Sequence, residues 1–220
     1  RIAEVSFNGY FWRFGTHHAG GFVLGYDSRF PGQEFDRLVV FHEATGQVAW
    51  TAPLSRRPVS PPVAIDGTVL IVDRGQLLRM ELSTGKPLWK ISLGGVIPQG
   101  DPPLVRGPSV AVAHKATPAA EEKQWRLSTR RLSDGGLEAQ VAIGLGDLFF
   151  PSPLLSMGRF VIVGSITLLQ VIDLENARTE ATLDLKKLLS WFVYADPPSL
   201  WIAASDAQGF ALTGTDGRLL

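Results

Sequence analysis

The sequence predicts an all-β fold, a β-propeller built from four-stranded antiparallel blades, and three observations favour it. Residues 61–93 read as four short strands in a row, each separated from the next by a turn. A turn of the same type recurs at steps of about 40 to 50 residues, the length of a propeller blade; its reference positions are Gly46, Gly85, Gly135, Ala177 and Gly217. Prolines precede the expected first strand of four copies, at Pro61–Pro62, Pro102–Pro103, Pro151–Pro153 and Pro197–Pro198.

The second unit justifies each strand most clearly. Val63–Ile65 follow two prolines, which a strand tolerates at its start, and Asp66-Gly67 suits a tight hairpin turn. Thr68–Val72 is β-branched and apolar, as in a buried strand. In Gln76–Leu82 apolar residues alternate with charged ones, which predicts a strand buried on one face. A further turn leads into the fourth strand.

The other units are placed by aligning this turn. The predicted blades span approximately residues 13–50, 61–93, 102–144, 151–185 and 197–220, the last completed by residues 1–7. Outside the second unit, strands are expected at residues 13–19, 22–26, 37–42, 104–105, 109–114, 124–132, 160–164, 168–174, 200–204 and 210–213. Leucines at helical spacing in residues 183–189 predict one turn of helix. The whole chain is therefore predicted to be a single propeller domain.

The sequence leaves two arrangements of the blades open. The fifth unit lacks its outer strand, and residues 1–7 have a strand pattern without a sheet. If this N-terminal strand completes the last blade, a five-bladed ring closes and the exposed sheet edges disappear. The alternative is that the chain belongs to a longer propeller of about seven or eight blades. Because residue 1 is Arg rather than Met, we expect a processed or partial chain.

The third strand and turn of two units resemble a known family. Residues 78–89 (LRMELSTGKPLW) and 39–50 (VVFHEATGQVAW) resemble the repeat of PQQ-like β-propellers, found in quinoprotein dehydrogenases and in outer-membrane-assembly lipoproteins of the BamB type. That repeat carries an acidic residue, then Thr-Gly, then Trp four residues after the glycine. His42 replaces the acidic residue in one copy; the third copy has Arg131 and Ala139, and the fourth has Ala177 and Ala181. The resemblance implies the fold more than a particular activity.

Composition excludes several classes of function. The 220 residues carry 21 basic and 21 acidic side chains, so no nucleic-acid partner is expected. Cysteine is absent, which removes disulfides, thiol chemistry and cysteine metal ligands. No apolar run reaches the ~18 residues of a membrane-spanning helix, so no direct membrane span is expected in this chain. The family resemblance implies a periplasmic or otherwise extracytoplasmic location.

We predict no catalytic residue, cofactor or metal site. By the resemblance, a quinoprotein dehydrogenase needs about eight blades, a calcium site and usually an adjacent cysteine pair, and this chain has neither the length nor the cysteines. His17 and His18 are adjacent on a strand and point to opposite faces, which disfavours a shared metal ion. The sequence places no partner for His42 or His114. Most aspartates stand beside Gly or Pro and are interpreted as turn formers.

The predicted binding face is one set of loops. In an up-and-down propeller, the connections from each outer strand to the next inner strand gather on one face near the axis. Here they are residues 8–12, 55–60, 96–101, 145–150 and 190–196. Aromatic rings and arginines are typical of protein-contact sites, and the candidate partner-binding residues are Tyr10, Phe11, Trp12, Arg56, Arg57, Phe149, Phe150, Trp191 and Tyr194. The rival interpretation is that these rings fill the central channel or pack between blades.

We therefore expect a non-catalytic scaffold that binds other protein subunits, within a larger extracytoplasmic or membrane-associated assembly. The alternative is a sensor domain for a small molecule or carbohydrate, because aromatic rings stack on sugars as well as on proteins. A propeller enzyme would need carboxylates at the channel mouth, where Asp101, Asp147 and Asp196 are the candidates.

Overall fold

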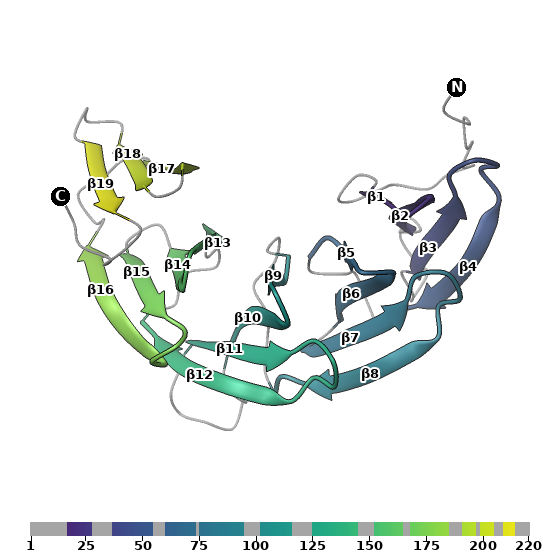
Figure 1. Ribbon diagram of the computed structural model, residues 1–220, viewed down its shortest axis with the longest axis horizontal. Coiled ribbons are helices and arrows are strands. Elements are labelled where there is room, and N and C mark those ends of the chain that lie inside the picture. The colour runs from purple at the N-terminus through teal and green to yellow at the C-terminus, as the bar shows by residue number, and fades with distance from the viewer. Residues whose placement is uncertain are drawn as a thin grey trace, which may run out of the picture. The chain divides into compact units, whose positions relative to one another are not determined.

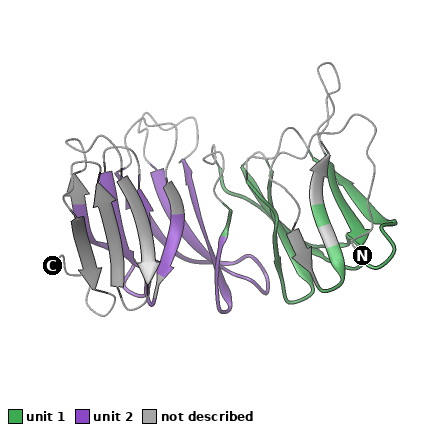
Figure 2. Ribbon diagram, turned by 90° about the horizontal axis from the view of Figure 1, so that it is seen from above, with its two compact units in different colours: residues 1–103 green, residues 104–220 purple. Residues whose placement is uncertain are grey.

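The computed structural model describes residues 17–27, 37–54, 60–73, 75–94, 102–115, 125–144, 152–164, 168–184, 191–196, 199–204 and 209–213. The nineteen strands in these ranges pair antiparallel and form four four-stranded sheets and one three-stranded sheet (Figure 1). This confirms the all-β class and the four-stranded unit predicted from the sequence. The chain divides into two compact units, residues 1–103 and 104–220 (Figure 2). In the described part, no helix is long and apolar enough to cross a membrane.

The first unit contains two sheets whose strands lie in chain order. The first sheet consists of β1 (His17–Ala19), β2 (Phe22–Asp27), β3 (Arg37–His42) and β4 (Val48–Pro53). The second consists of β5 (Val63–Ile65), β6 (Thr68–Asp73), β7 (Gln76–Glu81) and β8 (Pro87–Ser92). Strand β6 is buried at every position, as its β-branched sequence predicts.

The second unit repeats this plan and adds a third sheet. Its first sheet consists of β9 (Leu104–Arg106), β10 (Ser109–Lys115), β11 (Trp125–Arg131) and β12 (Leu137–Ile143). The next consists of β13 (Ser152–Met157), β14 (Phe160–Gly164), β15 (Leu168–Asp173) and β16 (Arg178–Asp184). Strands β17 (Trp191–Asp196), β18 (Ser199–Ala204) and β19 (Gly209–Thr213) form the last sheet.

Short turns with positive φ angles close the hairpins. Asp66 and Gly67 have φ values of 45° and 66° and join β5 to β6. Positive φ at both central residues matches the twist of the flanking strands, which is why Asp-Gly is favoured there. The turn predicted at this dipeptide is confirmed.

In each four-stranded sheet, the pairing between the third and fourth strands contains a β-bulge or similar irregularity at the same place. The pairing register shifts between Val40 and Phe41, between Arg79 and Met80, between Thr129 and Arg130, and between Val171 and Ile172. A bulge at one fixed place in every copy aligns the repeats residue by residue. On this alignment Trp50, Trp89, Ala139 and Ala181 are equivalent, and Gly46, Gly85, Gly135 and Ala177 are equivalent, as the sequence predicted.

Each unit builds its core between neighbouring four-stranded sheets. In the first unit the buried cluster is Leu24, Leu38, Val40, Leu54, Val69, Ile71, Met80 and Leu82, with Phe22 and Trp50 packed against it. In the second unit the cluster is Ala111, Ala113, Trp125, Leu127, Val141, Ile143, Leu154, Val161, Val163 and Ile172, with Leu104 and Leu174 packed against it. The two cores occupy equivalent positions but differ in side-chain size.

Two expectations from the sequence are wrong. Residues 191–196, expected to be part of a connecting loop, form strand β17, which pairs with β18 along its length. The aromatic and β-branched residues in WFVYAD favour a strand, and they outweigh the position of the prolines that follow. Leu183 and Asp184 belong to strand β16 and not to a helical turn. Residues 1–7, expected to complete the last blade, and residues 185–189 lie outside the described residues.

Candidate binding site

Trp50 joins the two sheets of the first unit. Its indole Nε1 donates a hydrogen bond of 2.7 Å to the carbonyl oxygen of Leu82. The ring also lies directly over the turn at Gly85, where an added Cβ would stand 2.7 Å from Cδ2 and Cε3 of the indole. Gly85 has φ +72°, so the turn needs glycine both for its backbone conformation and for the space that the indole takes.

The equivalent junction of the second unit has neither the tryptophan nor the glycine of this contact. Ala139 of β12 takes the place of Trp50, and Ala177 takes the place of Gly85. Ala177 keeps the left-handed backbone of the turn, with φ 49°, although this conformation is costly for a residue with a Cβ. The repeat has therefore changed on both sides of one contact.

The loss of volume extends along a whole row of the sheet. In the first unit the row across three neighbouring strands is Leu24, Val40 and Trp50. In the second unit the same row is Ala111, Thr129 and Ala139. Two residues along the strand, on the same face, Ser109 stands where the first unit has Phe22. Three of these residues, Ala111, Ala139 and Ser109, are smaller than their counterparts and leave space that the first unit fills.

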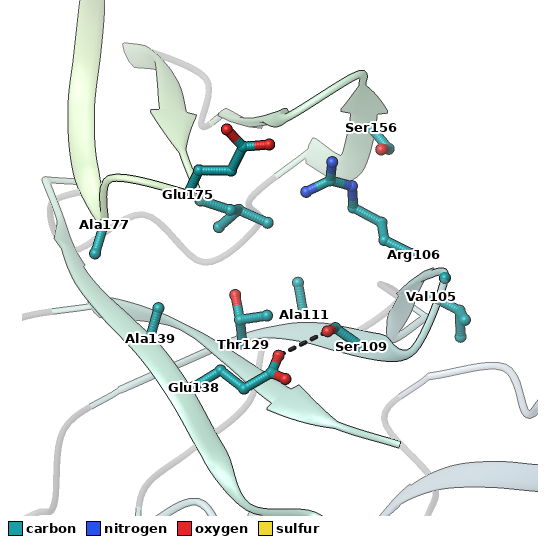
Figure 3. Close-up of a pocket in the computed structure, with 12 residues that line it drawn as sticks. Val105, Arg106, Ser109, Ala111, Thr129, Glu138, Ala139, Ser156, Glu175 and Ala177 are labelled. Carbon is teal, nitrogen blue, oxygen red and sulfur yellow. Dashed lines mark hydrogen bonds between the residues drawn. The ribbon is translucent and has the colours of Figure 1, made fainter. Parts of the chain in front are cut away.

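This space is a cleft of about 780 Å³ between the β9–β12 sheet and the β13–β16 sheet (Figure 3). The lining residues come from five strands and two turns: Val105, Arg106, Gly107, Ser109, Ala111, Thr129, Glu138, Ala139, Ser156, Leu174, Glu175 and Ala177. A volume of this size is within the usual range for a small-molecule site. Its lining combines apolar and polar side chains in similar proportion.

Thr129 presents an unusual polar group to the cleft. Its side chain is only 8% exposed, and its hydroxyl has no hydrogen-bond partner among the described residues. In Figure 3 this hydroxyl is on the side of Thr129 that faces the opposite sheet. A buried hydroxyl without a partner costs about 1–3 kcal/mol. A ligand that supplies the missing hydrogen bond would recover that free energy.

Charged side chains lie at the rim of the cleft. Arg106, at the end of β9, donates a hydrogen bond from Nη2 to the carbonyl oxygen of Gly158, which holds the guanidinium across the opening (Figure 3). The equivalent positions of β1 and β5 carry Ala19 and Ile65. Ser109 donates a hydrogen bond of 2.6 Å to Glu138 Oε2. Glu175 faces the cleft from the opposite sheet.

Asp173 stabilises the turn that carries Glu175 and Ala177. Its fully buried carboxylate accepts hydrogen bonds from the backbone of Glu175 at 3.0 Å and from the side chain of Asn176 at 2.7 Å, and it pairs with Arg159 at 3.5 Å. Burial alone would raise the pKa of Asp173, but these hydrogen bonds and the arginine together hold the pKa below its ordinary value. The wall of the cleft is therefore fixed by a charged side chain.

His114 forms a buried network beside the cleft sheet. Its Nδ1 lies 3.0 Å from the carbonyl oxygen of Lys115, and its Nε2 lies 2.7 Å from the hydroxyl of Ser128. The Ser128 hydroxyl oxygen accepts a hydrogen bond from Gln140 Nε2. The carbonyl requires a proton on Nδ1, so Nε2 accepts from Ser128. Burial is the main cause that lowers the pKa of His114. The hydrogen bond to the Lys115 backbone raises this pKa, and the positive charges of Arg130 and Arg126 lower it further.

Most of the residues predicted to bind a partner lie outside the described residues: Tyr10, Phe11, Trp12, Arg56, Arg57, Phe149 and Phe150. Trp191 and Tyr194 lie in β17, opposite Ala204 and Trp201 of β18. Asp196 ends the same strand, whereas Asp101 and Asp147 lie outside the described part. In the described ranges, no three histidine, aspartate or glutamate side chains are grouped to hold a metal ion.

The cleft lies at the other end of the strands from the predicted loop face. It is bounded by the turn after β9 and the turn after β15, whereas the connections into β9 and from β12 to β13 are at the opposite strand ends. The sequence did contain its signal, because Ala139 and Ala177 both depart from the repeat. We predicted no site from these departures.

Comparison with known proteins identifies the repeat. The family model described as "Outer membrane protein assembly factor BamB" matches residues 8–219. BamB from Moraxella catarrhalis aligns with 91% of the chain at 14% identity and a TM-score of 0.63. Quinohemoprotein alcohol dehydrogenase ADHIIG from Pseudomonas putida HK5 aligns with 93% at 10% identity and a TM-score of 0.61. The Cps50 (Swd1) β-propeller domain from Myceliophteria thermophila aligns with 97% at 14% identity and a TM-score of 0.58.

These similarities establish a β-propeller fold. The chain spans 60% of the length of the BamB structure, 40% of the dehydrogenase and 68% of the Cps50 domain. No curated protein sequence matches the chain. At such low identities the structural comparison supports the fold, and the function has to be argued from the site.

Proposed function

Because the chain belongs to the family described as outer membrane protein assembly factor BamB, we propose that it is a non-catalytic β-propeller that binds a partner protein outside the cytoplasm. The family description names an assembly factor. The quinohemoprotein alcohol dehydrogenase is similar in fold, but no cofactor-binding residues are predicted in this chain. A binding role needs a shaped surface and fixed polar groups, and the cleft in the second unit has both.

The observation that carries this proposal is the cleft at Ala139 and Ala177. A repeat that merely decays would lose packing and stability at random positions. Here small side chains replace large ones along one row, and a charged and a hydroxyl side chain appear at its edge. Binding sites combine apolar side chains with a few placed polar groups in this way.

A second candidate function is binding of a small molecule or carbohydrate in the same cleft. The volume of about 780 Å³ supports it, since small-ligand sites have volumes of about 300–1,000 Å³. The two functions predict different masses for the protein isolated from its source. A scaffold is found in a complex much heavier than the protein itself, whereas a sensor is found alone or with a small ligand.

Site-specific photocrosslinking combined with native mass spectrometry tests the proposed function. A benzophenone amino acid placed at Glu175, on the rim of the cleft, is expected to capture a partner protein in its native compartment. The same group at Lys90, an exposed residue of β8, is the matched control and is expected to capture much less. A protein that is isolated alone and crosslinks to nothing at either position would contradict the scaffold function.

A further inference from the structure

We propose that the cleft accepts an aromatic side chain, tryptophan or tyrosine, from a peptide segment of the partner. This inference rests on the proposed function and names the group that the site recognises. In the first unit the equivalent space is occupied by a ring of the chain itself, Trp50.

The shape of the cleft favours a flat ring. At the junction that Trp50 fills, the indole lies between the row Leu24–Val40 and the turn at Gly85. In the second unit Ala111 and Ala139 form one wall, and Leu174 and Ala177 form the other. Three of these four side chains are alanines and all four are apolar, so the space between them suits a planar apolar group. Burial of an aromatic ring brings a large hydrophobic gain.

The chain cannot fill this cleft with its own tryptophan by the same geometry. A Cβ at Gly85 would stand 2.7 Å from the indole of Trp50, and Ala177 carries such a Cβ. A ring attached to position 139 would therefore collide with Ala177. A ring supplied by another chain is not tied to position 139 and can shift away from Ala177 within the larger space. The paired change to Ala139 and Ala177 thus keeps the site open for an incoming ring.

The polar groups favour a ring with a hydrogen-bonding edge. The Thr129 hydroxyl stands in place of one methyl group of Val40 and has no partner among the described residues. An indole N–H or a phenol O–H can satisfy it, whereas phenylalanine cannot. Arg106 extends across the opening from β9, where a guanidinium can lie over an aromatic face and add a cation–π attraction. Both features select tryptophan or tyrosine.

Titration of the ¹⁵N-labelled full chain tests this inference without an identified partner. The probes are N-acetyl-tryptophanamide, N-acetyl-tyrosinamide, N-acetyl-phenylalaninamide and N-acetyl-leucinamide. We expect the backbone amide signals of Thr129, Ala139 and Ala177 to shift with the tryptophan and tyrosine probes, weakly with phenylalanine and not with leucine. Thr129→Val is expected to weaken tryptophan binding about fivefold, the loss of one hydrogen bond, and to leave phenylalanine binding unchanged. Equal binding of all four probes would overturn the inference.

A second experiment fills the cleft with a side chain of the protein itself. The double variant Ala139→Trp/Ala177→Gly restores the pair found at Trp50 and Gly85 and is expected to abolish the probe shifts. If that variant does not fold, Ala111→Leu, which restores the residue at Leu24, serves the same purpose. If the partner crosslinks to Glu175 equally well in the wild type and the filled variant, the ring-acceptor inference is wrong and the scaffold function stands. Absence of any partner contradicts the scaffold function even where the probes bind.

Discussion

The indole nitrogen of Trp50 donates a hydrogen bond to the carbonyl oxygen of Leu82, 2.7 Å away, across the junction between two sheets. The hydrogen bond and the contact with Gly85 depend on one another, because the ring reaches Leu82 only by lying over a residue without a side chain. The equivalent pair in the second unit is Ala139 and Ala177, and the space between them is the candidate site. The stability predictions follow from this comparison.

Replacement of Trp50 measures what the ring contributes to the first unit. Trp50→Phe removes the bond to Leu82 and leaves its carbonyl without the indole donor, so we expect a loss of about 1 kcal/mol. Trp50→Ala also removes the packed ring, and we expect a loss of about 3–5 kcal/mol. Leu88→Ala is the control, because Leu88 is 51% exposed, and surface changes stay within about 0.5 kcal/mol. Urea denaturation provides these values; equal losses for Phe and Ala would contradict the role of the ring.

Alanine variants of Gly85 and Gly67 distinguish the cost of backbone strain from the cost of a steric clash. Both glycines have positive φ angles, +72° and +66°, but a Cβ at Gly67 meets nothing within 4 Å. We expect Gly67→Ala to cost about 1–2 kcal/mol, the price of the left-handed backbone alone. Gly85→Ala carries the same backbone cost and also displaces Trp50, so its loss of unfolding free energy is expected to be larger by at least about 1 kcal/mol. Thermal denaturation of both variants gives the comparison, and equal costs would argue against the contact.

The Ala177→Gly variant is expected to be more stable than the wild type. The φ of Ala177, 49°, lies in the left-handed region, which costs a residue with a Cβ about 1–2 kcal/mol. Glycine at this turn should recover about 1 kcal/mol. Ala181→Gly, within strand β16, is the control and is expected to lose about 0.5–1 kcal/mol, because glycine weakens a strand. A destabilising Ala177→Gly would show that the turn is not strained.

His114 is expected to make stability depend on pH. Burial lowers its pKa below the ordinary value of 6.5, so between the two values the unfolded chain binds more protons than the folded protein. The free energy of unfolding therefore rises with pH in this window. The contribution of His114 is fully present above 6.5 and is lost as pH falls toward the folded pKa. The melting temperature measured from pH 8 to pH 5 tests this. His114→Gln is expected to flatten the profile, and an unchanged profile in this variant would contradict the role of His114.

Local sequence signals predicted the strands and turns well. Asp66-Gly67 and the alternation in Gln76–Leu82 specify short-range structure, which depends on residues close in the chain. The expectation of a loop at Trp191 is wrong because the β-forming residues of this segment outweigh the prolines that follow it. The loop face with Tyr10, Phe150 and Arg56 stays a prediction.

The candidate site could not be predicted in the same way. Ala139 and Ala177 were visible as departures from the repeat, but Ala111 and Thr129 become meaningful only when the pairing register places them in one row with Ala139. Residues far apart in sequence come together through three antiparallel pairings and the packing of a second sheet. No periodicity within one strand contains that information.

A double-mutant cycle on Ala139 and Ala177 tests the central claim most directly, that the cleft is a vacated tryptophan position. Ala139→Trp alone is expected to destabilise the protein, because its ring collides with the Cβ of Ala177. In the Ala177→Gly background the same change is expected to be stabilising, with a coupling energy of at least about 1 kcal/mol between the two positions. Additive effects of the two substitutions would contradict the claim, since they would show that position 139 and position 177 do not form one contact.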